Sequence, residues 1–577
     1  MLKTLLAQVR EFKKASFLTP FFMILEVLFE TLIPLAMASI IDKGVEAGNI
    51  GHIYRMGAVM VALALCGLWS GVMGGKYGAL ASTGFARNLR KAMYTNIQTF
   101  SFSNIDKYST AGLITRLTTD VTNLQNAYQM ILRMCTRAPA SLICAMVMAF
   151  LINAKLASIY LVAVIFLGGC LIFIMRKATV YFQAVFRKYD DLNASVQENI
   201  GAVRVVKAYV REDYEISKFQ KACNKVYEMF LKAEKIVVMN MPLMQFTVYA
   251  CILGISWLGA KMIVGSSLTT GELMSLLTYC MNILMSLMML SMVFVMVTMS
   301  IASAERVTEV INDTADITDP EDPVTEVPDG SIVFDHVNFS YAGEGGNLSL
   351  KDVNLHIKSG QTVGIIGGTG SAKSTLVQMI PRLYDVTGGA VKVGGIDVRD
   401  YDLEVLRDQV SMVLQKNVLF SGSIYENIRW GDEHASDEEV RRVCKLAQAD
   451  GFVTEFPNGY DTMIVQGGNN VSGGQKQRLC IARALLKKPK ILILDDSTSA
   501  VDTKTDALIR KAFREEIPDT TKIIIAQRVS SIEDADQIIV LDGGQIVGVG
   551  TSEELLKTNE IYREVYESQV KGGEEDE

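Results

Sequence analysis

Residues 367–375 read GGTGSAKST and combine one lysine with three glycines and four hydroxyl side chains. This segment follows an apolar run typical of a strand, which ends at Ile366, and it precedes a helical pattern. A glycine-rich loop in that context lets successive backbone N–H groups point at a phosphate, and the helix N-terminus adds its positive dipole. Lys373 would then reach the β and γ phosphates of a nucleotide, and Ser374 would hold Mg²⁺. The residues expected around the nucleotide here are Gly367, Gly368, Thr369, Gly370, Ser371, Ala372, Lys373, Ser374 and Thr375.

Ala372 departs from the strict form of this loop, which has glycine at that position. A Cβ atom there is unfavourable only if the backbone needs a positive φ or touches the nucleotide closely. We therefore expect phosphate binding to be weakened and not lost. A chance glycine-rich turn would explain this segment taken alone, but the motifs that follow make that alternative negligible.

Two more motifs of the same kind lie further along the chain. Residues 491–496 read ILILDD, which predicts a buried strand that ends at Asp495, a carboxylate placed to hold Mg²⁺. Residues 469–478 read NNVSGGQKQR and lead into a helix, so their N–H groups form a second phosphate-binding surface. The residues of this second surface are Ser472, Gly473, Gly474 and Gln475.

Six apolar segments precede these motifs, and each is long enough, or nearly so, to cross a bilayer about 30 Å thick. They lie at residues 17–41, 56–75, 138–154, 156–175, 236–263 and 273–301. The third is short, so we expect its helix to begin earlier, and residues 153–155 must form a tight turn before the fourth. Apolar residues make up 49% of the whole chain, and nearly all of the excess lies before residue 303.

Basic residues gather in two long connections between these segments, at residues 76–137 and 176–235, whereas the short connections have few. Because basic loops stay on the cytoplasmic side, we expect a multi-pass protein of the cell membrane with both termini in the cytoplasm. Each long connection keeps helical periodicity over about 60 residues, which predicts two long intracellular helical hairpins.

Glu26 and Glu30 lie four residues apart in the first span and share one helix face, with Pro34 one turn further on. Ionisable residues within a span need a partner or a cavity. One interpretation is a carboxylate pair that lines a path for cationic substrates. The alternative is pairing with a basic or hydroxyl group of another helix.

The sixth span carries six methionines at steps of three or four residues, which places them on one stripe of the helix. Methionine is flexible and polarizable and is common at surfaces that bind many ligands. The stripe could contact substrate, or it could be ordinary helix packing. Its members are Met281, Met285, Met288, Met292, Met296 and Met299, of which Met285, Met288 and Met292 are the candidates for substrate contact.

The second half of the chain has the composition of a soluble domain. Residues 303–330 become acidic and proline-rich and are interpreted as a linker. Alternating strand and helix patterns then predict an α/β domain over residues 331–569, with a disordered acidic tail at 570–577. The net charge of −7 argues against nucleic acid as a partner. Nine cysteines without paired short spacing predict neither a disulfide framework nor a metal site.

The order of the motifs, from GGTGSAKST through VLQKN and SGGQ to LDDSTSAVD, resembles the ATP-binding cassette family. With six preceding spans, the whole chain resembles the half-transporters of ABC exporters. The resemblance implies a multidomain chain, with a six-helix transmembrane domain and long cytoplasmic helical extensions in residues 1–302, fused to an α/β P-loop cassette. It further implies that ATP and Mg²⁺ drive export of a hydrophobic or amphipathic substrate across the lipid bilayer, and that the chain works as a dimer. Residues 108–121 and 198–212 resemble the hairpins that couple cassettes to membrane helices.

The resemblance also implies roles for single residues. Tyr341 would stack on the adenine. Gln415 would join Ser374 and Asp495 at Mg²⁺ and sense the γ-phosphate. The SGGQ segment would close on nucleotide held by the opposite subunit, and Asp502 would cross the dimer interface.

Two catalytic positions depart from the family pattern. Asp496 stands where the family usually has the Glu that positions the attacking water. Its shorter side chain draws the carboxylate back, and a misplacement of about 1 Å can reduce a rate on the order of a hundredfold. Gln527, in IIIAQR, replaces the expected switch histidine and cannot carry a positive charge. Gln466 stands where a Glu commonly precedes the SGGQ segment.

These departures weaken the chain's own site while SGGQ is kept, which indicates the degenerate-site subunit of a heterodimer. Its partner would be a second half-transporter that carries the catalytic Glu, and a homodimer with two slow sites is the alternative. The residues leave a drug, a lipid or a peptide open as the substrate. A gating subunit of a channel would need a charged, water-lined path, which the apolar spans disfavour. Importers are disfavoured because spans and cassette share one chain, and without a peptidase domain before the first span we expect no cleavage of leader peptides.

Overall fold

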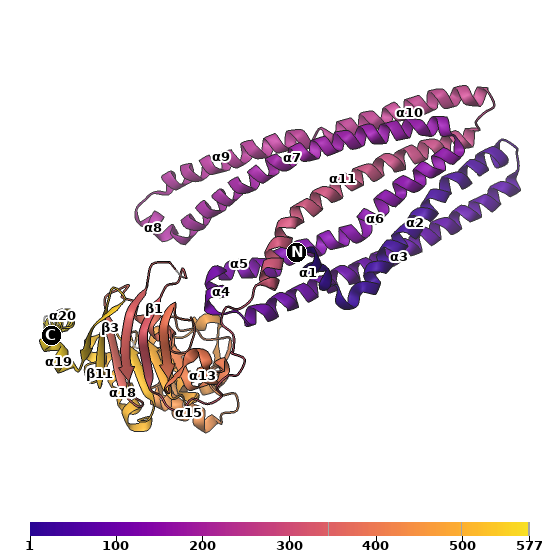
Figure 1. Cartoon of the computed structure of the whole chain (residues 1–577). Helices are drawn as coiled ribbons and strands as arrows, with labels where there is room; N and C mark the ends of the chain where they lie inside the picture. The colour runs from indigo at the N-terminus through magenta and orange to yellow at the C-terminus, as the bar shows by residue number, and fades with distance from the viewer. Residues whose placement is uncertain (344, 498, 575–577) are drawn as a thin grey trace. The chain divides into compact units, whose positions relative to one another are not determined.

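The computed structural model describes residues 1–343, 345–497 and 499–574. The chain divides into two compact units. The first contains Met1–Thr99 and Ser109–Asp313, and the second contains Phe100–Tyr108 and Thr314–Glu577. Figure 1 shows long helices in the first unit and strands covered by shorter helices in the second. The predicted fold class, a helical membrane domain fused to an α/β domain, is confirmed.

The first unit is built from helices joined by short turns. Its helices are α1 Leu2–Ala7, α2 Lys13–Ile40, α3 Ile50–Gln98, α5 Thr110–Thr115, α6 Val121–Ile152, α7 Ala154–Gly201, α8 Val203–Ala208, α9 Glu212–Val237, α10 Asn240–Val264 and α11 Thr270–Asn312. In the described part of the chain, six helical stretches are long and apolar enough to cross a membrane. They are Arg10–Val45, Ile50–Gln98, Thr110–Ile152, Ala154–Phe182, Glu212–Val264 and Thr270–Asn312.

Several of these helices are much longer than a bilayer requires. Helix α3 has 49 residues and α7 has 48, whereas about 20 residues suffice to cross a membrane. Helix α7 packs against α9, and the short α8 joins them at the end of this hairpin (Figure 1). These lengths confirm the predicted helical extensions beyond the membrane.

The turn between the third and fourth spans is tighter than predicted. Helix α6 ends at Ile152 and α7 begins at Ala154, so Asn153 alone makes the turn that the sequence assigned to residues 153–155. The Asn153 side-chain oxygen accepts hydrogen bonds from the backbone N–H groups of Lys155 and Leu156, at 3.1 and 3.2 Å. This N-cap lets the new helix start at once.

The second unit is built around three sheets, of which the six-stranded one has strands from distant parts of the chain. The strand orders are β2-β1-β4-β5, β12-β11-β3-β10-β9-β6 and β7-β8. The strands are β1 Ile332–Phe339, β2 Leu350–Ile357, β3 Thr362–Gly367, β4 Gly388–Val393, β5 Ile396–Asp397, β6 Val410–Val413, β7 Gly422–Ser423, β8 Met463–Ile464, β9 Ile491–Asp495, β10 Thr521–Ile525, β11 Gln537–Asp542 and β12 Gln545–Gly550. The helices are α4 Phe102–Lys107, α12 Lys373–Gln378, α13 Leu403–Gln409, α14 Ile424–Ile428, α15 Asp437–Leu446, α16 Asp450–Glu455, α17 Gly473–Leu486, α18 Thr503–Glu516, α19 Ser552–Thr558 and α20 Glu560–Glu574.

The six-stranded sheet positions the phosphate-binding loop. Strands β11, β3, β10, β9 and β6 pair in parallel, and their residues are almost all buried, as expected for a sheet covered on both faces. Parallel neighbours bring their carboxyl ends to one edge, where open α/β sheets bind ligands. The segments that follow β3, β9, β10 and β6 carry the candidate site residues.

The predicted linker at residues 303–330 begins later than expected. Helix α11 continues to Asn312 because Ala304, Val307 and Val310 recur every three residues on a buried face. The residues that follow belong to the second unit and pack on it, and Ile317 and Val327 are buried there.

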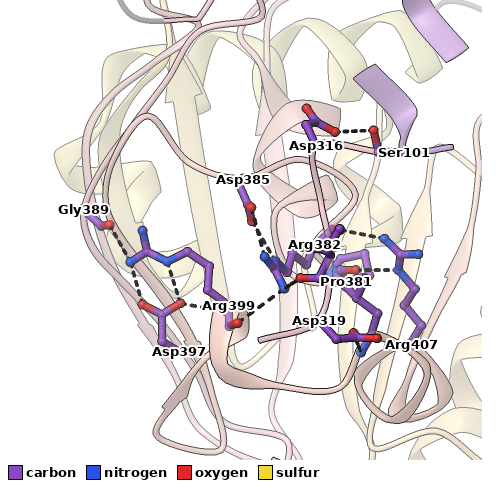
Figure 2. A network of polar contacts seen from close by, with 12 residues as sticks. Ser101, Asp316, Asp319, Pro381, Arg382, Asp385, Gly389, Asp397, Arg399 and Arg407 are labelled. Carbon is purple, nitrogen blue, oxygen red and sulfur yellow. Dashed lines mark hydrogen bonds and ion pairs between the residues drawn. The ribbon is translucent and has the colours of Figure 1, made fainter. Parts of the chain in front are cut away.

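Polar contacts hold this segment in place (Figure 2). Asp316 accepts hydrogen bonds from the hydroxyls of Ser101 and Ser103, which flank the start of α4. Burial alone would raise the pKa of Asp316, but these hydrogen bonds outweigh it and hold the pKa below its usual value. Figure 2 also shows Arg382 beside the segment, where its guanidinium donates to the Thr318 carbonyl over 3.2 Å.

The predicted disordered tail at residues 570–577 is also shorter than expected. Helix α20 runs from Glu560 to Glu574, so most of the tail continues a helix. Residues 575–577 lie outside the described residues. The apolar positions Ile561, Val565 and Tyr566, which pack against the core of the second unit, anchor the helix from which the tail extends.

Candidate functional site

The loop between β3 and α12 has the geometry of a phosphate cradle. The Lys373 ammonium donates to the carbonyls of Gly367 and Gly368, at 2.9 and 2.8 Å, so it lies on the concave side of the loop. Burial lowers the pKa of Lys373, although the carboxylates of Asp495 and Asp496 act in the opposite direction. The two acids thus face the same space as the lysine.

Ala372 adopts the left-handed conformation, with φ 71° and ψ 26°. A non-glycine residue is uncommon in that region, because the Cβ atom crowds the backbone at a cost of roughly 1–2 kcal/mol. The sequence predicts weakened phosphate binding if the backbone at Ala372 has a positive φ. The structure meets this condition. The loop keeps its shape because the adjoining strand and helix are buried in the core.

Ser374 and Asp495 come together at the end of β9. The Ser374 hydroxyl donates to Asp495 Oδ1 over 3.0 Å. Asp495 is buried, and this burial raises the pKa of its carboxyl. A hydroxyl and a carboxylate oxygen fit Mg²⁺, which usually takes one or two protein oxygens together with substrate phosphates. The described residues contain no cluster of three His, Cys, Asp or Glu side chains that could hold a metal by itself.

Asp496 and Gln527, the two departures from the family pattern, are hydrogen-bonded to each other. Gln527 Nε2 donates to Asp496 Oδ2 over 2.7 Å. The Gln415 side chain also hydrogen-bonds this carboxylate. Burial raises the pKa of Asp496, and the two amides partly offset that rise. The structure thus unites three residues that the sequence places far apart.

Tyr341 presents its ring beside this loop and is 54% exposed. Its hydroxyl lies 3.1 Å from the Thr375 hydroxyl, and its ring packs edge-on against Tyr384 at 5.3 Å between centroids. An exposed aromatic face next to the phosphate loop suits stacking on a base.

The SGGQ segment forms the N-terminus of α17. Ser472 Oγ accepts from the Gln475 N–H over 3.3 Å, and Gln475 Oε1 accepts from the Ser472 N–H over 2.9 Å. A Cβ atom on Gly474 would lie 2.7 Å from the carbonyl oxygen of Ala500, so glycine is needed there. Asp502 caps the next helix, α18, by accepting from the Thr505 N–H over 2.9 Å.

Comparisons with known proteins agree with this geometry. Residues 16–304 match the family model of the ABC transporter transmembrane region, and residues 350–499 match the family model described as ABC transporter. The chain is 37% identical to the uncharacterized ABC transporter ATP-binding protein YfiB of Bacillus subtilis, over 96% of this chain and 98% of the relative. The chain belongs to the ABC transporter family.

Two further relatives and one solved structure extend the comparison. The ATP-dependent lipid A-core flippase of Desulfotalea psychrophila is 34% identical over 84% of each chain. The probable multidrug resistance ABC transporter YheI of Bacillus subtilis is 36% identical over 73% of this chain and 72% of its own. A bacterial Atm1-family ABC exporter with ATP bound superposes with a TM-score of 0.79 at 26% identity, covering 95% of this chain and 97% of that one. This ABC transporter is therefore a multi-pass membrane protein that couples ATP to export.

The intramembrane carboxylates of this transporter are paired. Arg137, on α6, donates to Glu26 over 2.9 Å and to Glu30 over 2.8 and 3.0 Å. This contact supports the pairing interpretation over a free carboxylate pair for cations. The sequence placed Arg137 in a cytoplasmic connection, because it precedes the apolar run that starts at residue 138. One signal could have placed Arg137 correctly: it lies within the helix that forms the third span, because that helix begins before the apolar run.

The methionine stripe of α11 has both exposed and partly buried members, and the side chain of Met299 lies outside the described residues. Met285 is 60% exposed and Met292 is 67% exposed, whereas Met288 is partly buried. Ordinary packing within one chain therefore does not account for Met285 and Met292. Sequence reasoning missed Tyr384 and Asp106, which join the α4 segment to the phosphate-loop region, because neither belongs to a motif.

Proposed function

We propose that this chain is the degenerate-site subunit of a heterodimeric ABC exporter. The observation that carries the proposal is the Asp496–Gln527 hydrogen bond, at 2.7 Å, in the position where a general base and its switch residue would act. Both residues are substituted relative to the family, and each now engages the other. The adjoining loop carries Ala372 in a left-handed conformation, which weakens the same half-site.

The geometry explains why hydrolysis would be slow at this half-site. A general base must lie within about 3 Å of the proton that it takes. The Asp496 carboxylate is short and already accepts hydrogen bonds from Gln415 and Gln527, so fewer of its lone pairs can accept from a water. Gln527 can donate one hydrogen bond to a γ-phosphate, but it brings no charge to the transition state.

Nucleotide binding itself would be retained. Lys373 and the loop N–H groups would hold the phosphates, Tyr341 would stack on the adenine, and Ser374 with Asp495 would hold Mg²⁺. Mg²⁺ bound there supplies charge neutralisation for the phosphates. Asp496 and Gln527 would orient the nucleotide more than they activate water.

The second half-site of the proposed dimer would be competent for ATP hydrolysis. There the partner contributes the P-loop and the catalytic Glu, and this chain contributes the helix start at Ser472 and the Asp502 segment. The capping box of Ser472 and the close fit of Gly474 against Ala500 hold that helix start in order. ATP hydrolysis at this half-site would drive export.

The substrate that fits best is a hydrophobic or amphipathic molecule. One relative is named a lipid A-core flippase and another a probable multidrug resistance transporter, so lipids and drugs are both supported classes. The exposed Met285 and Met292 give α11 an adaptable apolar surface for such a molecule. The ion pairs from Arg137 to Glu26 and Glu30 leave no free carboxylate pair for a cation there.

The test is the ATPase rate of the purified chain, measured alone and after co-expression with a neighbouring half-transporter that carries the catalytic Glu. We expect the chain alone to be nearly inactive and the pair to be active, with activity lost when the partner's Glu is replaced by Gln. In the chain alone, Asp496→Glu should raise the rate by about tenfold or more, because the carboxylate moves forward by about 1 Å. Vigorous ATPase activity of the unmodified chain alone would instead establish a homodimer in which Asp496 supports catalysis.

A further inference from the structure

A pocket of about 380 Å³ lies between α7 and α9, the two helices that the short α8 joins (Figure 1). Its lining is rich in basic side chains, because four of the described lining residues are lysines and only one is an acid. The lining residues are Lys188, Asp191, Ser195, Tyr214, Ser217, Lys218, Lys221, Ala222 and Lys225. The pocket has the size of a small-molecule site, and its charge favours an anion.

The sequence places three of these lysines on one face of α9. Lys218, Lys221 and Lys225 follow one another at steps of four residues or fewer, which gives a row about 10 Å long on a helix. Lys188 lines the same pocket from α7. Like charges at these spacings repel one another and destabilise a helix. A bound anion would remove this repulsion.

Two of the four lysines are neutralised by carboxylates. Lys188 donates to Asp191 over 2.9 Å, and Lys218 donates to a glutamate of α7 over 3.1 Å. Lys221 and Lys225 are exposed, and within the described residues no hydrogen bond or ion pair engages their ammonium groups. The charge of these two groups is therefore available to a ligand.

The uncharged polar groups of the pocket also suit phosphate. Ser195 and Ser217 line it with hydroxyls, which can donate hydrogen bonds to phosphate oxygens. A lysine binds phosphate as a point charge, so several lysines can hold a phosphate chain without a fixed geometry. Tyr214 lines the same pocket and is 62% exposed, which leaves an aromatic ring accessible there.

The pocket lies further from the membrane than lipid headgroups reach. Lys188 is about 20 Å along α7 from residue 175, where the fourth apolar segment ends. Lys225 is about 16 Å along α9 and α10 from residue 236, where the fifth segment begins. Each headgroup layer is only roughly 5–8 Å thick. A ligand of this pocket would therefore come from solution and not from the bilayer.

We propose that this pocket binds a soluble polyphosphate, that is, an anion with two or more linked phosphate groups, either inorganic or part of a nucleotide. The lysine row of α9 is about 10 Å long, so it matches linked phosphates better than one isolated phosphate. Bound between α7 and α9, the anion would hold the two arms of this hairpin together. The site belongs to the first unit, whereas the phosphate loop belongs to the second, and it does not depend on the proposed heterodimer.

Binding of tripolyphosphate to the full chain in phosphatidylcholine nanodiscs tests this proposal. Every sample carries Lys373→Ala, so that the phosphate loop of the cassette contributes equally to all of them. Lys221→Gln combined with Lys225→Gln should weaken binding by about tenfold or more, since two charge-assisted contacts are lost. Lys232→Gln combined with Lys235→Gln is the matched control and should leave binding unchanged. Both are exposed lysines of α9 that do not line the pocket.

A second pair of variants adds a negative charge without removing a lysine. Ser217 and Gln220 are both exposed residues of α9, but only Ser217 lines the pocket. Ser217→Glu should weaken tripolyphosphate binding by about tenfold through repulsion, whereas Gln220→Glu should change it little. Inorganic phosphate should bind more weakly than tripolyphosphate, and added salt should weaken both, because exposed charges are screened.

The same assay separates the two sources of a phosphate chain. If the ligand is a nucleotide, GTP should bind this pocket more tightly than tripolyphosphate. Tyr214→Ala should then remove that advantage, because the exposed ring would no longer stack on the base. If the ligand is an inorganic polyphosphate, Tyr214→Ala should change neither affinity. Both outcomes support the polyphosphate site and differ only in the source of the ligand.

Two results would overturn the proposal. Equal effects of the pocket pair and the control pair of lysine variants would mean that these lysines form an ordinary solvated surface. Displacement of tripolyphosphate by a lower concentration of hexaglutamate would mean that the pocket receives an acidic protein segment. Neither result depends on ATP hydrolysis, so the pocket can fail this test while the proposed heterodimer stands, and the reverse.

Discussion

The methyl group of Ala372 is held where a glycine would be unstrained, at φ 71°. Relieving this strain should favour the loop conformation that binds phosphate by about 1 kcal/mol, because open conformations no longer compete as well. We predict that Ala372→Gly tightens ATP binding by about fivefold. Equilibrium binding of a fluorescent ATP analogue to the full chain measures this change.

Gln448 offers a matched control for that substitution. It also has a positive φ, of 54°, and it lies two residues beyond the end of α15, away from the phosphate loop. Gln448→Gly should raise thermal stability without changing ATP affinity, because glycine is favoured after a helix end. If both substitutions changed affinity equally, local strain in the loop would not be the cause.

The site residues differ in how far the sequence could predict them. Lys373, Ser374 and Asp495 belong to short motifs whose spacing fixes the local geometry, and the structure brings them together. The sequence could not predict whether Ala372 has a positive φ, because backbone angles at one residue depend on the packing around the loop. Arg137 was misplaced, since only the tertiary fold puts it beside Glu26.

Tyr384 is one of the residues that attach helix α4 to the rest of the second unit. The Tyr384 hydroxyl donates to Asp106 over 2.6 Å, and its ring packs against Phe102 at 6.0 Å. The same ring contacts Tyr341, the residue proposed to stack on adenine. Burial raises the pKa of Tyr384, so its phenol stays a neutral donor at physiological pH. Tyr384 thus joins the adenine face to α4.

We predict that Tyr384→Phe reduces the stimulation of ATPase by substrate about threefold, because the Asp106 carboxylate of α4 loses the hydrogen bond that it accepts from Tyr384. Basal ATPase and the KM for ATP should change little, since the ring and its contact with Tyr341 remain. The co-expressed pair in nanodiscs, with and without an amphipathic substrate, provides the measurement. Tyr401→Phe is the control, as it removes another buried hydroxyl, which donates to the Val393 carbonyl over 2.9 Å. A similar loss in both variants would contradict a specific role for Tyr384.

Long elements were predictable from the sequence, and short ones were not. The six spans and the parallel strands carry strong apolar patterns, and such patterns predict the type of element whatever the surrounding fold. Helix α4, which reads FSNIDK, has only six residues, too few to show an amphipathic period, so nothing in the sequence places it in the second unit. The acidic segment was interpreted as a linker, yet Asp316 and Asp319 each accept hydrogen bonds within the second unit.

The domain organisation of the chain follows from composition alone, because apolar residues concentrate in one half and motifs in the other. What composition does not reveal is the assembly. In the proposed dimer of cassettes, two composite half-sites would each combine the P-loop of one chain with the SGGQ segment of the other. In the proposed heterodimer, the two motifs of this chain therefore serve half-sites of unequal activity.

Because the two half-sites differ in activity, we predict that two substitutions lower the ATPase rate of the co-expressed pair by different amounts. Gly473→Glu places a carboxylate at the start of α17, facing the partner's nucleotide, and should lower total ATPase by about tenfold or more through repulsion of phosphate. Lys373→Ala disables only the slow half-site and should leave about half or more of the rate. Gly473→Ala is the control for folding, because a Cβ atom there meets only Ala500, at 3.6 Å. If Lys373→Ala and Gly473→Glu reduced the rate equally, the two half-sites would be equivalent, and Asp496 and Gln527 would not define a degenerate site.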